Sequence, residues 1–193
     1  MITNVLLTGV GGQGTITASQ ALAQACLLQD WQIKKSEIHG MSQRGGSVQA
    51  HIRIAERVCA PVISPGEVDY LLAFEAAEGL RWAPALAATG LAVVSTQHIV
   101  PPLASQGNHE YPFDAIERMR GQGHRVIAVD GTAICEKIGS GKVAGIVLVG
   151  ALAAQRPFAE ATWRQAIANE VGAAWLPMNL AAFAGGLEQG RSV

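Results

Sequence analysis

The sequence predicts an α/β protein: a three-layer, Rossmann-like mixed sheet with helices on both faces and a helical C-terminal third. With 193 residues, 49% of them hydrophobic, the chain can bury the core of one domain, expected to span residues 1–193. Short apolar runs alternate with helical patterns as far as residue 135, which is typical of an α/β sheet. The patterns after that point are helical, so the last third is expected to cover the sheet or reach a partner.

The first elements are three strands and one helix. Residues 5–10 are an apolar run ending in glycines, which indicates a buried strand, and residues 13–29, rich in Ala, Leu and Gln, predict a helix. Residues 33–38 and 48–54 alternate as strands do. Only nine residues separate the last two runs, whereas a crossover between parallel strands needs about a dozen or more. These two strands are therefore predicted to be antiparallel neighbours.

The second half of the sheet is predicted from three more apolar runs, at residues 68–74, 91–96 and 125–129. Asp69 and Glu75, at the ends of the first of these, are expected to be solvated or to cap a neighbouring element. The remaining segments with helical patterns are residues 113–120, 133–138, 142–155, 159–170 and 178–187.

Composition excludes several classes of function. A net charge of -1 with only 15% charged residues provides no basic field for nucleic acid. No stretch reaches the ~18 consecutive apolar residues of a membrane helix, and the N-terminus leads directly into a strand, so we expect no signal peptide and a cytoplasmic protein. The low charge and mean hydropathy of +0.24 favour a permanent partner, although a well-packed monomer with an Ala-rich core is an alternative.

No metal site or tightly bound cofactor is predicted on this chain. Cys26, Cys59 and Cys135 are isolated, and no C-x-x-C run exists to hold an iron-sulfur cluster. The five histidines are too scattered to suggest a metal cluster. The turn at residues 130–132 lacks the longer Gly-Asp-Gly and Asn pattern with which thiamine diphosphate enzymes hold a metal ion.

A first glycine-rich segment satisfies G-x-G-x-x-G where a predicted strand meets a predicted helix. Such a turn exposes backbone N–H groups at a helix N-terminus, where the macrodipole favours an anion such as pyrophosphate. We therefore expect a phosphate or nucleotide loop here. Its residues are Gly9, Gly11, Gly12, Gln13 and Gly14.

The same motif leaves alternatives open. Asp30 and Glu37 lie near the ~20-residue distance at which a Rossmann acid meets a ribose, so an autonomous nucleotide-binding dehydrogenase is one of them. A non-catalytic nucleotide-binding regulatory module is another. The expected antiparallel strand pair and the lack of a hydride-transfer constellation count against the dehydrogenase. The glycines could also serve only to pack the helix close to the sheet.

A second glycine-rich segment combines flexible backbone with polar side chains and is predicted to be an interface or ligand loop. Its glycines permit close backbone approach, and Arg44 offers a forked donor that matches phosphate or carboxylate. The alternative is an ordinary hairpin turn. Glu37, His39 and Arg44 are possible contributors to a partner's active site. The loop consists of Gly40, Met41, Ser42, Gln43, Arg44, Gly45 and Gly46.

Together with residues 69–75 and 179–183, these two segments form four motifs in order along essentially the whole chain. In these motifs the sequence resembles the gamma-type subunits of the 2-oxoacid:ferredoxin oxidoreductases, and among them the small, beta subunits of the indolepyruvate type. The resemblance implies a complex that oxidatively decarboxylates a 2-oxoacid, such as indolepyruvate or another aryl pyruvate, to an acyl-CoA. Electrons would pass to ferredoxin, with coenzyme A as co-substrate.

The resemblance also implies a division of labour. The large subunit would bind thiamine diphosphate, magnesium and the iron-sulfur clusters, and this chain would be the small subunit packed against it, inactive alone.

Overall fold

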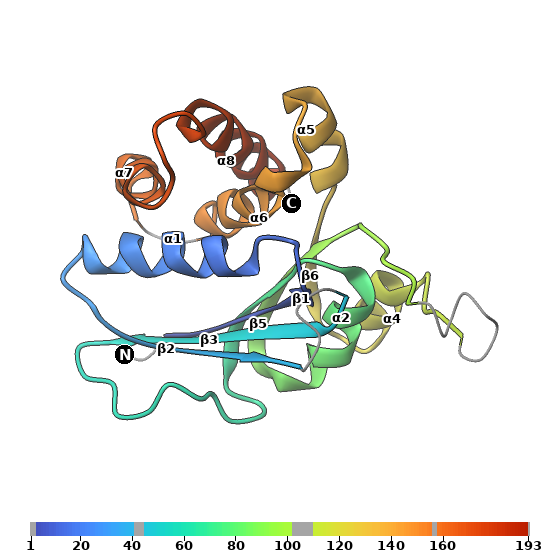
Figure 1. Cartoon of the computed structure of the whole chain (residues 1–193). Helices are drawn as coiled ribbons and strands as arrows, with labels where there is room; N and C mark the ends of the chain where they lie inside the picture. The colour runs from blue at the N-terminus through green and yellow to red at the C-terminus, as the bar shows by residue number, and fades with distance from the viewer. Residues whose placement is uncertain (1–2, 41–44, 102–109, 156–157, 193) are drawn as a thin grey trace.

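The structure is a computed structural model that describes residues 3–40, 45–101, 110–155 and 158–192 (Figure 1). Its centre is a six-stranded sheet in the order β2-β3-β1-β4-β5-β6. The strands are β1 (Thr3–Val10), β2 (Gln32–His39), β3 (Ser47–Ala55), β4 (Val68–Ala73), β5 (Leu86–Ser95) and β6 (Arg125–Val129).

The sheet is mixed, as predicted. Strands β1, β4, β5 and β6 are parallel neighbours, whereas β3 runs antiparallel to both β1 and β2. The antiparallel pairing of residues 33–38 with residues 48–54 is thus confirmed. After β1 the chain turns through α1 (Thr15–Leu27) toward one edge, and after β4 it turns through α2 (Ala76–Trp82) toward the other. The carboxyl ends of β1 and β4 therefore form a topological switch point, where open α/β sheets bind ligands.

Helices cover both faces of the sheet, which confirms the predicted layers. Figure 1 shows α1 and α6 next to one face, with α7 and α8 farther out. The opposite face packs against α2 and α4. Besides α1 and α2, the helices are α4 (Ala115–Gly121), α5 (Gly131–Ile138), α6 (Ala144–Ala153), α7 (Glu160–Glu170) and α8 (Leu176–Arg191), with the 3-10 turns η1 (Ala83–Ala85) and η2 (Gly141–Val143).

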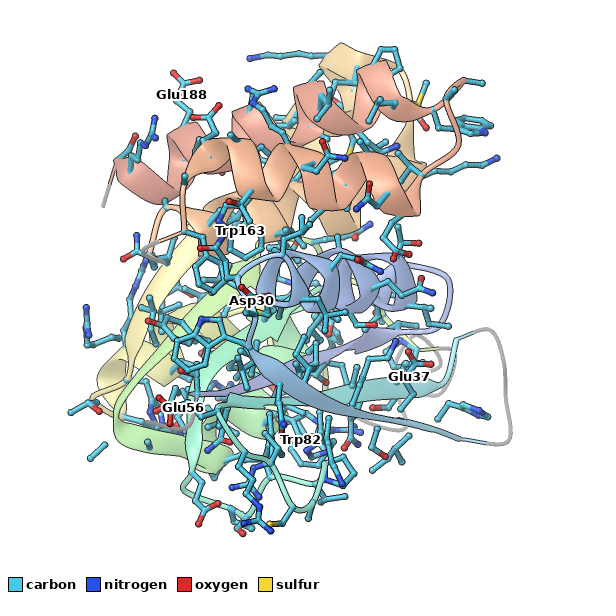
Figure 2. All side chains as sticks on the ribbon, turned by 90° about the vertical axis from the view of Figure 1, so that its left-hand side faces the viewer. Asp30, Glu37, Glu56, Trp82, Trp163 and Glu188 are labelled. Carbon is cyan, nitrogen blue, oxygen red and sulfur yellow. The ribbon has the colours of Figure 1, made fainter. Side chains whose placement is uncertain are left out.

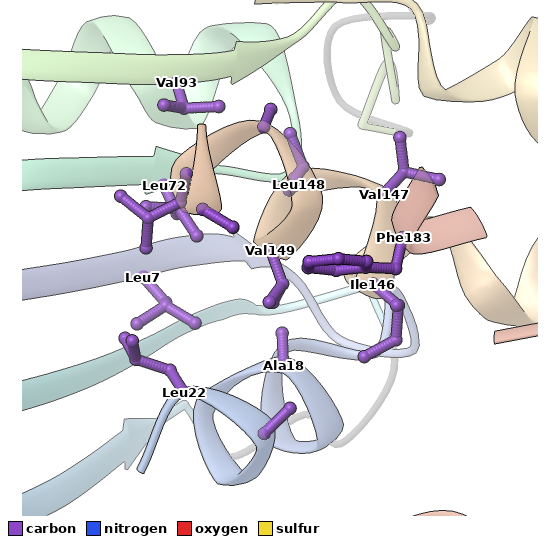
Figure 3. Close-up of a cluster of buried hydrophobic side chains, with 14 of the residues drawn as sticks. Leu7, Ala18, Leu22, Leu72, Val93, Ile146, Val147, Leu148, Val149 and Phe183 are labelled. Atoms are coloured by element: carbon purple, nitrogen blue, oxygen red, sulfur yellow. The ribbon is translucent and has the colours of Figure 1, made fainter. Parts of the chain in front are cut away.

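Two hydrophobic cores lie on the two faces because side chains alternate along each strand. In β1, Val5 and Leu7 join the core under α1 and α6, whereas Leu6 joins the core under α2 and α4. Figure 3 shows the first core, in which Leu7 of β1 lies near Leu22 of α1. Farther out, the buried Trp163 of α7 lies between the outer helices and α1 (Figure 2).

Helices α6 and α8 pack with almost no space between their backbones. A Cβ atom at Gly186 of α8 would lie 1.9 Å from the carbonyl oxygen of Val147, and one at Gly150 of α6 would lie 2.2 Å from that of Phe183. Every residue of α6 from Gly145 to Ala153 is buried, as expected for a helix that is apolar all round. In the described part of the chain, no helix combines the length and apolar character needed to cross a membrane.

Two elements differ from the predictions. Helix α2 was not expected, because its seven residues are too few to show a periodic pattern. Glu75 begins this helix, and its carboxylate accepts a hydrogen bond of 2.8 Å from the Glu78 N–H. Of the two alternatives expected for Glu75, solvated or capping, the capping role is therefore the one that the structure shows, and Glu75 is only 1% exposed.

Strand β5 starts at Leu86, five residues before the predicted start at residue 91. The pairing with β4 shifts register between Val68 and Tyr70. Gly90 lies at this irregularity, where a Cβ atom would come within 2.7 Å of the Val68 carbonyl oxygen. In the sequence, this glycine indicates the end of a strand, so the predicted strand began only after it.

Candidate functional site

The first glycine-rich segment forms the turn between β1 and α1. Gly12 and Gly14 have φ angles of 104° and 83°, in the left-handed region that favours glycine. Gly14 is the N-cap of α1, and neither a side-chain cap nor an acidic residue occupies the first turn of this helix. The first N–H groups of α1 are therefore available to an anion.

Two other residues of the segment are used inside the chain. The Gly11 N–H donates to the Gly46 carbonyl at 2.9 Å, which extends the ladder between β1 and β3. The Gln13 side chain accepts from the Val10 N–H at 2.7 Å and donates to the Phe74 carbonyl at 2.7 Å. Gln13 thus ties the carboxyl ends of β1 and β4 together at the switch point. A sequence motif alone does not reveal this tie, because Phe74 lies 61 positions from Gln13 along the chain.

The structure brings part of each predicted group together in one pocket of about 430 Å³. A volume of this size falls within the usual range for small-molecule sites. Of the predicted glycine loop, Gly9 and Gln13 do not line this pocket. Glycine-loop residues form one wall, and Glu37 and His39 from the end of β2 form another. The lining residues are Gly11, Gly12, Gly14, Thr15, Ile16, Glu37, His39 and Val48.

The charge of Glu37 is balanced by Lys35 of the same strand. Its carboxylate is 2.8 Å from the Lys35 ammonium group, and the Ser19 hydroxyl lies 3.4 Å from it. The paired carboxylate repels an incoming phosphate less than a lone one would. The His39 ring nitrogen Nδ1 lies 3.2 Å from the Gly40 carbonyl oxygen.

Asp30 cannot act as the ribose acid of a nucleotide site. It lies in the turn after the C-terminal end of α1, with a φ of 59°. The 13 residues of that helix span about 20 Å, so Asp30 is far from the glycine loop. Figure 2 labels Asp30 and Glu37, which lie apart in this view. Of the two acids, only Glu37 lines the pocket.

The second glycine-rich segment continues directly from the pocket wall. Gly40 follows His39, and Gly45 and Gly46 lead into β3, with Gly45 at a φ of 76°. Met41, Ser42, Gln43 and Arg44 lie outside the described residues. The prediction for their side chains therefore stays a prediction.

Gly45 also lines a second cavity of about 400 Å³, on the α2 side of the switch point. Here the buried Glu75 carboxylate accepts hydrogen bonds from the Tyr111 hydroxyl and from the Ile99 N–H. Burial, together with the Glu75 hydrogen bond and charge, raises the pKa of Tyr111 far above its ordinary value, so the phenol stays protonated. Glu78 accepts from the Ser47 hydroxyl at 2.7 Å.

This network was missed in the sequence. The three-residue spacing of Glu75 and Glu78 resembles a capping box and was the available signal for a helix start. Tyr111 could not be connected to it, because the two segments are distant along the chain. In the described part of the structure, no group of three His, Cys, Asp or Glu side chains is placed to hold a metal ion.

The sequence identifies the class of protein that has this fold. A model of the pyruvate ferredoxin/flavodoxin oxidoreductase family matches residues 4–189. The chain belongs to this family and is a subunit of a 2-oxoacid:ferredoxin oxidoreductase. The resemblance inferred from the four motifs is confirmed.

Sequence relatives narrow the comparison. The chain is 37% identical to the indolepyruvate oxidoreductase subunit IorB of Archaeoglobus fulgidus over 190 residues, which cover 96% of this chain and 94% of that protein.

Solved structures share the fold. The gamma subunit of a keto/oxoacid ferredoxin oxidoreductase from Geobacter sulfurreducens superposes with a TM-score of 0.73 at 23% identity, covering 99% of each chain. The 2-oxoglutarate:ferredoxin oxidoreductase from Magnetococcus marinus, with 2-oxoglutarate, coenzyme A and succinyl-CoA bound, gives a TM-score of 0.76 at 17% identity. That match covers 100% of this chain and 31% of the other, so the same fold there is part of a much longer chain.

Proposed function

We propose that this chain is the small subunit of a cytoplasmic complex that oxidises indolepyruvate or a related aryl pyruvate. The substrate loses CO₂, its acyl group is transferred to the coenzyme A thiol, and two electrons pass to ferredoxin. The relative named for indolepyruvate supports this substrate, since the identity of 37% extends over 96% of the chain. Thiamine diphosphate, magnesium and the iron-sulfur clusters belong to the large subunit, in keeping with the isolated cysteines of this chain.

The main support for the role of this chain is the pocket that the glycine loop lines together with Glu37 and His39. The uncapped N-terminus of α1 points backbone donors and a positive macrodipole end toward this pocket, which suits a phosphate group of coenzyme A or of a nucleotide. The chain would therefore hold the phosphate-bearing end of a ligand whose reacting end lies on the partner.

We propose that the large subunit binds at the same edge of the molecule. Ile16 lines the pocket and is 53% exposed, and Ile38, beside Glu37 and His39, is 44% exposed. Because side chains alternate along a strand, Ile38 lies on the opposite face of β2 from Glu37 and His39. Exposed apolar side chains near a Gly-rich polar loop resemble the mixture of apolar and polar groups in protein interfaces. Residues 40–46 would then contact the large subunit near its active site, with Glu37, His39 and Arg44 supporting that site.

Co-expression with the large subunit tests the function. Purified complex, assayed with a panel of 2-oxoacids, coenzyme A and an artificial electron acceptor, should turn over indolepyruvate and other aryl pyruvates best. The small chain alone should show no turnover. Oxidation of a substrate by the small chain alone with a nicotinamide cofactor would support the dehydrogenase alternative. A complex equally active without this chain would support the regulatory module.

A matched pair of variants tests the phosphate site within that complex. Ile16→Glu places a carboxylate in the first turn of α1, where it suits the helix but repels a phosphate. We expect the KM for coenzyme A to rise at least about tenfold, with kcat nearly unchanged, because like charges in one pocket cost several kcal/mol. The control is Ile16→Gln, whose side chain has the size of Glu but no charge. Its KM for coenzyme A should stay near that of the wild type. Equal KM values in all three proteins would place the phosphate elsewhere.

A further inference from the structure

The side chain of Gln13 makes three hydrogen bonds where β1, β4 and β5 end. Its Oε1 atom accepts from the Val10 N–H at 2.7 Å, and its Nε2 atom donates to the Phe74 carbonyl oxygen at 2.7 Å. The third bond, of 3.0 Å, runs from Nε2 to the side-chain oxygen of Gln97. Because Val10 supplies a hydrogen and Phe74 supplies an acceptor, the orientation of the amide is fixed. The amide oxygen and the amide nitrogen of Gln13 are therefore both in use.

Gln13 also closes the backbone turn of the glycine loop. Its N–H donates to the Val10 carbonyl oxygen at 3.3 Å, which is the bond of a four-residue turn. The third residue of this turn is Gly12, whose φ of 104° requires glycine. Gln13 therefore holds Val10 by a backbone bond and by a side-chain bond, with Gly11 and Gly12 between them. Both of these glycines line the glycine-loop pocket.

The first glycine of the motif provides the space for this side chain. A Cβ atom at Gly9 would lie 2.8 Å from the Oε1 atom of Gln13 and 2.8 Å from the Cβ atom of Phe74. Gly9 is not among the glycines with a positive φ, so the absence of a side chain is what this position requires. The motif thus has two parts. Gly9 and Gln13 anchor the turn, whereas the other glycines of the motif line the pocket.

We propose that Gln13 is a positioning residue, which holds the glycine turn in the shape that presents its backbone N–H groups to a phosphate in the pocket. The effect on phosphate binding rests on the function proposed above, whereas the effect on the loop does not. The contacts also specify the residue type. Ionised Glu has no hydrogen for the Phe74 carbonyl, Asn is one methylene group shorter, and Met has neither a strong donor nor a strong acceptor.

The first test measures amide hydrogen exchange in the full chain, labelled with ¹⁵N. Gln13→Met keeps the length of the side chain and removes its three hydrogen bonds. Exchange should become at least about tenfold faster at Gly11 and at residue 13, whose N–H groups are bonded within the loop, while amides of β5 keep their wild-type rates. Wild-type rates at both loop sites would overturn the proposal. Equal acceleration in the loop and in β5 would also overturn it, because Gln13 would then stabilise the whole fold.

A milder variant and a matched control complete this test. Gln97 is exposed, so Gln97→Met should fold, and it removes only one of the three bonds. It should accelerate exchange at the same two loop sites by at least about twofold, in line with the net effect of one hydrogen bond. Gln24→Met, the same change at a half-buried residue farther along α1, should leave the loop unchanged. If Gln13→Met does not fold, wild-type rates in Gln97→Met overturn the proposal.

The second test uses the complex with the large subunit. Gln13→Met should raise the KM for coenzyme A at least about tenfold and change kcat less than about threefold, whereas Gln24→Met should change neither. Comparison with Ile16→Glu separates this proposal from the proposed function. If Ile16→Glu raises the KM and Gln13→Met does not, Gln13 does not position the loop for phosphate and the proposal is wrong. If neither variant raises the KM, the phosphate lies elsewhere, and the exchange rates decide whether Gln13 holds the loop.

Discussion

The glycines of the β1–α1 loop and those between α6 and α8 serve opposite purposes. Between the helices, Cβ atoms at Gly186 and Gly150 would lie 1.9 and 2.2 Å from backbone carbonyl oxygens, so glycine is required because there is no space. In the loop, a Cβ at Gly12 would have no neighbour within 4 Å, and one at Gly14 would have its closest neighbour at 3.9 Å. Glycine is needed there for its backbone angles, and the space beside it remains open.

This difference separates a surface that builds the fold from one that is free for a ligand or partner. The helix pair α6 and α8 closes completely, since the missing side chains bring the two backbones into contact. The loop instead presents backbone N–H groups beside a pocket of about 430 Å³. Substitutions between the helices should therefore affect stability most, and substitutions at the loop edge should affect binding most.

The largest effect is expected for Gly186→Ala. The added methyl group would overlap the Val147 carbonyl, so α8 must move away from α6 and the core between them must loosen. Overpacking of this kind against rigid backbone should cost more than about 3 kcal/mol of unfolding free energy. Denaturant unfolding measures the loss. Gly121→Ala, in α4 with open space around the new methyl group, is the control and should stay close to the wild type.

Gly186→Ala with wild-type stability would mean that α6 and α8 are not in backbone contact, and the contrast between the two sets of glycines would disappear.

A smaller loss is expected for Gly14→Val, on the order of 1–3 kcal/mol. The cost here is conformational, because a β-branched residue is strained at a φ of 83°, while its Cβ has space. Gly14→Asn should cost less, since Asn tolerates left-handed backbone better than other non-glycine residues. Thermal unfolding of the two variants distinguishes the causes. Equal losses in both would indicate that steric contact with the neighbouring η2–α6 segment, and not backbone strain, is limiting.

The positions of the strands and one antiparallel pair followed from the sequence, whereas the order of the strands in the sheet did not. The short connection between residues 38 and 48 fixed the antiparallel pair, and apolar runs located the parallel strands. The short helix α2 and the early start of β5 were missed, because one is too brief for periodicity and the other contains Gly90 at an irregularity.

The residues of the candidate site could be identified from the sequence, but their arrangement around one pocket could not. The glycine loop and Glu37 and His39 were identified separately by residue type, and their common pocket depends on the position of β2 at the end of its hairpin. The tie through Gln13 and the buried pair of Glu75 and Tyr111 connect residues more than thirty positions apart. Tertiary contacts of this kind leave no local pattern in a single sequence.

The central claim is that the Gly-rich edge of the molecule, which includes residues 40–46, binds the large subunit and does not stabilise the fold. The variant Arg44→Ala tests this claim most directly. Arg57→Ala is the matched control, an exposed arginine beyond the end of β3 that lies away from the loop. Arg57→Ala should unfold like the wild type, because an exposed charge contributes about 0–1 kcal/mol. We expect the same of Arg44→Ala, since the proposed role of Arg44 is in the complex.

The deciding measurement is the affinity of each variant for the large subunit together with the turnover of the reconstituted complex on indolepyruvate. Loss of a desolvated, hydrogen-bonded charge costs about 2–5 kcal/mol, so Arg44→Ala should reduce affinity or turnover at least about tenfold, whereas Arg57→Ala should change neither. If Arg44→Ala assembles with wild-type affinity and its complex turns over normally, Arg44 is a solvated loop residue and the functional surface lies elsewhere.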